Sequence, residues 1–240
     1  FFMLCSIIIP LYNKADFIGE ALQSIFNQTY QNFEVIIIDD GSKDDGAKRG
    51  QAIKDPRVKL VQQTNSGVSC ARNRGVELAQ GDIVCFLDAD DWYQPQYLDT
   101  IAAMAKQYPE VSFFTTKHKL IDTTKENVRF WDITEAAEIE IIDDFFYRWH
   151  GVLFHISSFA VRRSFLLPFQ PCFPVGEQMG EDQDLFFRLA EKSSFTHCSL
   201  RLTGYRTGVN DSLCASYRGN ALYPAYLRLR SEERRVGKEC

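Results

Sequence analysis

Two apolar segments of strand length run directly into clusters of acidic residues, and this feature constrains the fold more than any other. Residues 83–87 lead into Asp88-Ala89-Asp90-Asp91, and residues 35–38 lead into Asp39-Asp40-Gly41-Ser42. Such apolar runs are typical of parallel strands buried on both faces, and ligands of open α/β sheets bind at their carboxyl ends. Because close carboxylates repel each other unless a cation lies between them, the pattern predicts a site for a divalent metal that carries a phosphorylated ligand.

The alternation of strand-like and helix-like segments predicts an α/β fold. The predicted strands are residues 6–11, 33–38, 58–61, 83–87 and 111–116, and the predicted helices are a segment capped by Asp16, a short helix within 43–55, and residues 69–79 and 95–108. This order implies a mostly parallel sheet with right-handed crossovers, flanked by helices. Beyond residue 117 the pattern is looser, with helices predicted at 136–149 and 181–192 around an irregular, aromatic segment at 150–175.

Composition narrows the class of protein. Of the 240 residues, 45% are apolar, which is enough for a substantial core. The formal net charge is −5 and no Lys/Arg stripe precedes residue 231, which argues against a nucleic-acid partner. The seven cysteines are scattered, so neither a disulfide framework nor a zinc site is expected. No apolar run approaches the roughly 20 residues of a membrane-spanning helix and no export signal is present, which favours a cytoplasmic location. Residues 231–240 are interpreted as a non-native tail.

The acidic clusters offer specific chemistry. Asp88 and Asp90 are alternate residues at a strand end, so their carboxylates can share a metal such as Mg²⁺ or Mn²⁺ whose shell is completed by phosphate and water oxygens. The competing interpretation is a solvated acidic turn, but the preceding buried strand favours the metal site. Asp40 can accept a hydrogen bond from an N–H of a nucleotide base, and the alternative there is an ordinary Asp-Gly turn.

Two helix starts complete the set of candidates. The segment Asn65-x-Gly67-x-x-x-Ala71-Arg72-Asn73 places Arg72 near a helix N-terminus, where it can reach a phosphate or stack on a base. A capped surface helix is the alternative. Glu181 and Asp182 open a later helix, and these acids either complement the helix dipole or supply Asp182 as a general base at the edge of a pocket.

Together and in this order, the motifs resemble those of the family 2 glycosyltransferases of the GT-A fold. The resemblance runs from Ser6 to about Leu189, and its specificity comes from five ordered motifs at family-like spacing. These motifs are Ile9-Pro10-Leu11-Tyr12-Asn13, Asp39-Asp40-Gly41-Ser42, Asn65-x-Gly67 with Ala71-Arg72-Asn73, Asp88-Ala89-Asp90-Asp91, and Glu181-Asp182. The resemblance implies one Rossmann-like GT-A domain over residues 1–230, with a nucleotide-binding half at about 4–116 and an irregular helical acceptor half at about 117–230.

The resemblance also implies roles on the donor side of the site. Pro10 and Tyr12 would line the base pocket, with Tyr12 against the base. Asp40 would hydrogen-bond the base, and Arg72 would lie near the nucleotide. Asp88 would contact the ribose or the metal shell, with Ala89 beside it in the nucleotide-sugar site.

The remaining two roles concern the reaction. Asp90 would ligate Mn²⁺ or Mg²⁺, and Asp182 would deprotonate the acceptor hydroxyl. The implied activity is inverting, non-processive transfer of a sugar from a nucleotide-diphosphate donor, with a UDP-sugar favoured, to a glycan or lipid-linked acceptor. An acceptor of the second kind would bring the protein to the inner face of the cell membrane, through peripheral contact.

Two departures from the family pattern limit these implications. Processive members carry Gln-x-x-Arg-Trp after the catalytic Asp, whereas Arg148-Trp149 here lacks the Gln and precedes Asp182. Many members also have a His shortly after a Tyr-Arg pair, and none follows Tyr205-Arg206 closely. The competing hypothesis is therefore a catalytically inactive module that binds a nucleotide-sugar without turnover. A sugar-phosphate nucleotidyltransferase would need a Gly-rich loop after the first strand, and a phospho-acceptor receiver would need its acid pair there; the sequence has neither.

Overall fold

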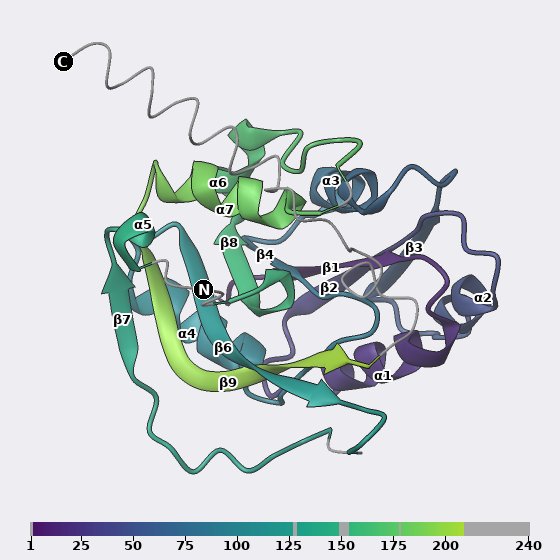
Figure 1. Ribbon diagram of the computed structural model, residues 1–240, viewed down its shortest axis with the longest axis horizontal. Coiled ribbons are helices and arrows are strands. Elements are labelled where there is room, and N and C mark those ends of the chain that lie inside the picture. Colours follow the sequence, from purple (N-terminus) through teal and green to yellow (C-terminus); the bar gives the residue numbers. More distant parts are fainter. Residues whose placement is uncertain (1, 127–128, 149–153, 178, 209–240) are drawn as a thin grey trace.

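The computed structural model describes residues 2–126, 129–148, 154–177 and 179–208, which form a nine-stranded sheet flanked by helices (Figure 1). The strands are β1 (Cys5–Leu11), β2 (Phe33–Asp39), β3 (Val58–Gln62), β4 (Ile83–Phe86), β5 (Trp92–Tyr93), β6 (Phe113–Asp122), β7 (Ile139–Ile142), β8 (Phe159–Arg162) and β9 (Phe195–Thr207). The helices are α1 (Ala15–Phe26), α2 (Gly46–Gln51), α3 (Val68–Leu78), α4 (Tyr97–Gln107), α5 (Phe145–Arg148), α6 (Arg163–Leu166) and α7 (Glu181–Ala190), with 3-10 turns η1 (Ile156–Ser158) and η2 (Leu167–Phe169).

The sheet has a parallel half and a mixed half. Its order is β3-β2-β1-β4-β8-β6-β9-β5, and β7 also pairs with β9. Strands β1 to β4 are parallel to one another, as predicted. β8 enters antiparallel between β4 and β6, whereas β9 runs parallel to β6 and antiparallel to β5 and β7. The predicted α/β class is confirmed, and its parallel arrangement holds for the first half of the chain.

Apolar side chains on both faces of the parallel strands form the core and fix the helices above and below it. Ile7, Ile36 and Val84 are at most 1% exposed. Helix α3 lies very close to β1. A Cβ atom added to Gly75 would lie 2.3 Å from Ile8 Cγ2, so the absence of a side chain at Gly75 permits this approach. In Figure 1, α3 and α7 lie on one side of the parallel strands and α1 lies on the other. The close approach of α3 positions Arg72 at the end of the sheet.

One predicted helix is wrong. The apolar spacing of residues 136–149 fits a helical period, but Ile139–Ile142 forms β7, which pairs with β9 so that Ile142 lies opposite Phe195. Three of the four residues of β7 are isoleucines, and β-branched side chains favour strands when a partner strand is available. Only the short helix α5 remains of the prediction, and Trp149 lies outside the described residues.

Smaller differences concern the element ends. β6 continues to Asp122, well past the predicted end at residue 116, because β9 pairs along its length. β8 and β9 are not among the predicted strands. Lys14 rather than Asp16 occupies the N-cap of α1, and Asp16 lies in the first turn.

Residues 231–240, which the sequence indicates as a non-native tail, lie outside the described residues. The division of the domain into a nucleotide-binding half and an acceptor half stays a prediction. None of the described helices combines the length and apolar character needed to span a membrane.

Candidate active site

The carboxyl ends of β1, β2 and β4 meet at one edge of the sheet. In the strand register Leu11 pairs with Asp39, and Ile8 pairs with Phe86. The loops that follow these strands therefore begin side by side, which brings Asp40 and the acidic loop 88–91 to the same edge, as predicted from parallel pairing.

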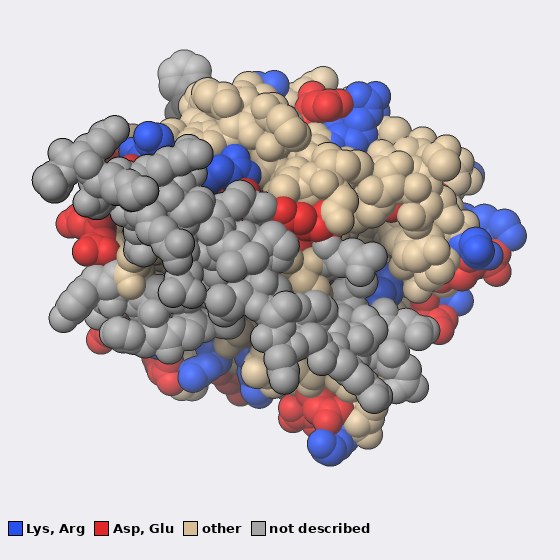
Figure 2. Space-filling view, turned by 45° about the horizontal axis from the view of Figure 1, so that its top comes forward, with Lys and Arg blue, Asp and Glu red and all other residues tan. Residues whose placement is uncertain are grey.

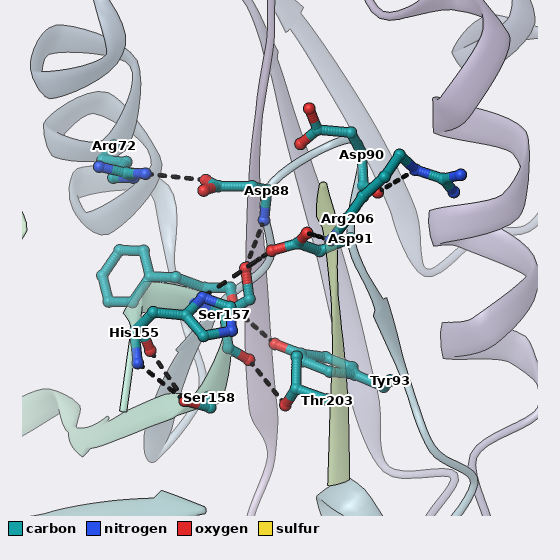
Figure 3. Close-up of polar contacts among 11 residues, drawn as sticks. Arg72, Asp88, Asp90, Asp91, Tyr93, His155, Ser157, Ser158, Thr203 and Arg206 are labelled. Atoms are coloured by element: carbon teal, nitrogen blue, oxygen red, sulfur yellow. Dashed lines mark hydrogen bonds and ion pairs between the residues drawn. The ribbon is translucent and has the colours of Figure 1, made fainter. Parts of the chain in front are cut away.

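Arg72 links the acidic loop to the start of α7. Its guanidinium is 2.8 Å from Asp88 Oδ1 and 2.7 Å from Glu181 Oε1, and it lies over the ring of Phe173. The side chain is only 4% exposed. Burial would lower the pKa of Arg72, but the carboxylates of Asp88 and Glu181 outweigh it and raise that pKa. Arg72 therefore remains a fixed positive charge that links the loop after β4 to α7, and Figure 3 shows its contact with Asp88.

Asp182 follows Glu181 in the first turn of α7, next to this cluster. The helix begins after Gly180, whose φ of 80° is in the left-handed region that favours glycine. Burial, and then the charge of Glu181, raise the pKa of Asp182 to about 7, although Arg72 opposes the shift. A half-buried carboxylate with such a pKa can take up and release a proton near neutral pH.

Asp90 faces a different cation. Its Oδ2 lies 2.7 Å from Lys14 Nζ, and the two side chains are 19% and 16% exposed. Figure 3 shows the carboxylate of Asp88 in contact with Arg72, whereas no contact joins the carboxylate of Asp90 to Arg72. The two carboxylates of the predicted metal site are thus each neutralised by a cation, one from α3 and one from the loop before α1.

The main chain of the acidic loop is anchored from the second half of the molecule. Arg206 donates from Nε to the carbonyl oxygen of Asp90 at 2.8 Å and from its backbone N–H to Asp91 Oδ1 at 3.0 Å. Ser157 Oγ donates to Asp91 Oδ2 at 2.6 Å and accepts from the backbone N–H of Asp88. Burial, and then the nearby Asp90, raise the pKa of Asp91 well above its usual range. Asp91 is therefore an anchor for the loop rather than an open ligand.

Sequence analysis missed the roles of three residues of this network. Lys14 and Ser157 were not among the candidates, and Arg206 was noted only for the missing histidine. The position of Lys14 directly after the Tyr12-Asn13 motif is the one sequence signal that could have identified it. Ser157 lies in a segment with no recognisable pattern, and only the tertiary contact reveals it.

The carboxylate of Asp40 is bound by the loop between β3 and α3. Its carboxylate accepts hydrogen bonds from Gln63 Nε2 at 2.8 Å, from the backbone N–H of Ser66 at 2.9 Å and from that of Gly67 at 2.8 Å. It thereby fixes the turn that starts α3. Tyr12 is 43% exposed just beyond the end of β1. The predicted contacts of Asp40 and Tyr12 with a base, together with that of the half-buried Pro10, stay predictions.

The acidic loop fits a hard divalent cation by the chemistry of its donors. Within the described residues no three His, Cys, Asp or Glu side chains form a metal-binding group. Asp88 and Asp90 nevertheless supply carboxylate oxygens, and Arg72 and Lys14 each contact only one oxygen of their partner. Mg²⁺ and Mn²⁺ need no more than one or two carboxylates when phosphate and water oxygens complete the shell.

The sequence matches a known protein family over most of the elements that form this site. The family model described as glycosyl transferase family 2 matches residues 6–167, which contain the strand ends, Arg72 and the acidic loop. The chain belongs to glycosyl transferase family 2.

Relatives within this family agree over part of their length. The chain is 43% identical over 102 residues to the uncharacterized glycosyltransferase YibD of Escherichia coli, and the match covers 42% of this chain and 30% of YibD. It is 36% identical over 168 residues to an uncharacterized glycosyltransferase of Haemophilus influenzae, covering 67% of this chain and 62% of the relative. The chain therefore spans less than two thirds of these relatives.

Solved structures share the fold. Staphylococcus aureus TarS (residues 1–349), solved in complex with UDP-GlcNAc, superposes with a TM-score of 0.74 at 24% identity, covering 90% of this chain and 62% of that chain. The mannosyltransferase PcManGT of Pyrobaculum calidifontis, solved with GDP-Man and Mn²⁺, gives a TM-score of 0.63 at 22% identity, covering 88% and 58%. These likenesses confirm the GT-A fold expected of a family 2 glycosyltransferase.

Proposed function

We propose that this family 2 member is an inverting, non-processive glycosyltransferase. It would move a sugar from a nucleotide-diphosphate donor to a hydroxyl group of a glycan or lipid-linked acceptor. The observation that carries the proposal is the position of Asp182, a carboxyl group with a pKa of about 7, beside the Arg72–Asp88 pair at the strand ends. A lipid-linked acceptor would bring the protein to the inner face of the cell membrane.

Asp182 would act as the general base. In an inverting displacement the acceptor attacks from the face of the sugar opposite the leaving diphosphate, so base and leaving-group contacts must come from different segments. Asp182 at the start of α7 and the acidic loop after β4 meet this requirement. As the bond to the anomeric carbon forms, Asp182 accepts the proton of the acceptor hydroxyl. Arg72 forms ion pairs with Asp88 and Glu181, and Asp182 is the acid of this cluster whose pKa is raised to about 7.

The acidic loop would hold the divalent cation. Asp90, with Asp88 beside it, supplies the carboxylate oxygens, and a bound Mn²⁺ or Mg²⁺ would neutralise charge that grows on the departing diphosphate. Arg206 fixes the main chain at Asp90 and so limits where that carboxylate can lie. The Mn²⁺ in the PcManGT structure supports this assignment.

A UDP-sugar is the favoured donor. TarS was solved with UDP-GlcNAc and PcManGT with GDP-Man, so the fold accommodates both bases. Uracil and guanine both offer N–H groups that Asp40 can accept. One oxygen of Asp40 already accepts two hydrogen bonds and the other accepts one, which leaves capacity for one further donor.

The first test is calorimetric titration of UDP and GDP, each with Mn²⁺ and with EDTA, into the wild-type protein and Asp90→Ala. We expect Mn²⁺-dependent binding of one nucleotide that the variant loses. Asp99→Ala, an exposed acid in the first turn of α4, is the matched control and should bind like the wild type. Failure of both nucleotides to bind the wild-type protein would overturn the proposal.

The second candidate is a nucleotide-sugar-binding module without turnover. The observation in its favour is that Lys14 and Arg72 already neutralise both acids of the metal site. The transferase and the inactive module differ in whether free sugar is released from the UDP-sugar in the presence of Mn²⁺. A slow hydrolysis that is lost in Asp182→Asn would require a working base and would favour the transferase. Binding without any hydrolysis or transfer would favour the inactive module.

A further inference from the structure

The ion pair between Lys14 and Asp90 is incomplete on the side of the lysine. An ammonium group has three N–H donors, and the Lys14 Nζ is buried. Among the described residues, the Asp90 carboxylate 2.7 Å away is its ion-pair partner, and no hydrogen-bond acceptor is positioned for it otherwise. A buried cation with unused donors at the carboxyl ends of parallel strands indicates that an anionic ligand belongs there.

The backbone around Lys14 is held, so only its side chain is free to change position. On one side, Asn13 has a φ of 52°, its N–H donates to Ser42 Oγ, and its Oδ1 accepts from the N–H of Lys43. On the other side, the N–H of Ala15 donates to a carboxylate oxygen of Asp44 at 2.8 Å. The four-carbon stem of a lysine can carry its charge several ångströms without moving these anchors.

The two cations of the metal site differ in how firmly they are held. Arg72 is held between two carboxylates, those of Asp88 and Glu181. Lys14 has one carboxylate, and a divalent cation placed on that carboxylate would lie within a few ångströms of the ammonium. Two positive groups at that distance repel strongly in a partly buried site. A cation at Asp90 therefore requires the ammonium of Lys14 to leave.

We propose that Lys14 is an exchangeable counterion of Asp90. Its ammonium holds the carboxylate before a divalent cation binds, and it moves to a phosphate oxygen of the nucleotide diphosphate when the cation takes its place. This inference rests on the proposed function for the identity of cation and diphosphate. The exchange makes binding of the two ligands cooperative, because the cation releases the lysine and the diphosphate receives it. Each ligand must then tighten the other by the same factor.

Binding of Mn²⁺ alone, followed by the loss of its free-ion paramagnetic resonance signal, tests the first half of the exchange. Lys14→Met should bind Mn²⁺ about tenfold more tightly than the wild type, because the competing charge is gone. Lys14→Arg keeps the charge and should retain the weaker affinity. Lys48→Met is the control, since Lys48 is an exposed lysine paired with Asp45, and it should behave like the wild type.

The second half is tested by repeating the Mn²⁺ titration at saturating UDP or GDP, whichever binds. In the wild type the nucleotide should tighten Mn²⁺ binding, and in Lys14→Met this coupling should fall about tenfold while the affinity for Mn²⁺ alone rises. Unchanged or weaker Mn²⁺ binding by Lys14→Met, or an equal gain in Lys48→Met, would overturn the exchange. If the wild type binds Mn²⁺ but neither nucleotide, the proposed function fails together with this second half, whereas the first titration still decides the competition at Asp90.

Discussion

The two sides of the candidate site neutralise their acids in different ways. On the side of α3 and α7, Arg72 is bound to both Asp88 and Glu181 and is stacked over an aromatic ring, with 4% of its side chain exposed. On the side of α1 and β9, Lys14 pairs with one carboxylate of the described residues, that of Asp90, and lies over the ring of Phe17, and its side chain is 16% exposed. The first arrangement is a closed network, whereas the second leaves a charge that another cation can replace.

This difference indicates that the two sides of the site have separate roles in proton transfer and in diphosphate binding. The closed network surrounds Asp182 and sets its electrostatic environment, because Arg72 opposes the rise of the Asp182 pKa that burial and Glu181 cause. The open side presents Asp90, whose main chain is fixed by Arg206 while its carboxylate remains available for exchange. Proton transfer and diphosphate binding would thus be controlled separately. Each of the following predictions tests whether the two sides are independent.

The largest effect is expected from Asp182→Asn. An amide cannot accept the proton of the acceptor hydroxyl, so we expect transfer to slow by about 10² to 10⁴. The Kd values for Mn²⁺ and nucleotide should remain as in the wild type, because the proposed metal ligand Asp90 pairs with Lys14. Transfer rates with a UDP-sugar and calorimetric titrations of the same preparation provide the two measurements.

Asp184→Asn is the matched control for this variant. Asp184 lies in the same turn of α7 and pairs with Arg188 along the helix. It should keep most of the activity. If Asp182→Asn transferred sugar at the wild-type rate, or if it lost Mn²⁺ binding, the assignment of the base or the separation of the two sides would be wrong.

Arg72→Met should have the next largest effect, on stability. The variant leaves Asp88 and the buried Glu181 without their shared cation, and removing one partner of a buried ion pair costs about 3–5 kcal/mol. Lys14→Met breaks an ion pair with one carboxylate and should cost less than Arg72→Met. The free energy of unfolding in urea measures both variants against the wild type. Equal losses would contradict the contrast between a closed and an exchangeable network.

The parallel half of the fold was predictable because its strands are buried on both faces. Residues 35–38 and 83–87 consist of apolar residues alone, so composition, length and the following acids indicate strands at once. Parallel pairing then brings their carboxyl ends together without further information. The convergence of Asp40, Asp88 and Asp90 at one edge therefore follows from the sequence and a general rule of sheet geometry.

The mixed half was less predictable for a physical reason. β9 places Thr196, His197 and Thr203 in buried positions, so its sequence lacks both an apolar run and a regular alternation. The isoleucines of β7 fit a helical period as well as a strand, and the pairing with β9 decides between them. The links from Arg72 to Glu181 and from Arg206 to Asp90 depend on this half. Sequence analysis could therefore name Asp182 through a motif but could not supply the contacts that set its pKa.

The smallest effect concerns the pH dependence of transfer. Burial, and secondly Glu181, raise the pKa of Asp182 to about 7, and the base must be ionised to accept a proton. The rate of transfer should therefore rise about tenfold per pH unit below 7 and level off above it. The Kd for nucleotide, measured at the same pH values, should not follow this curve, because Asp90 and Lys14, which are proposed to hold cation and diphosphate, form a separate ion pair.

The same titration should appear in stability with a defined sign. Because the pKa of Asp182 is higher in the folded protein than its usual 3.8, the folded state holds the proton more tightly than the unfolded chain. The resulting stabilisation is complete below pH 3.8 and is lost as the pH rises through about 7. Asp182→Asn cannot ionise, so the wild type should lose stability relative to this variant between these pH values. Parallel stability curves would show that Asp182 ionises at an ordinary pKa, and the rate profile would then require another base.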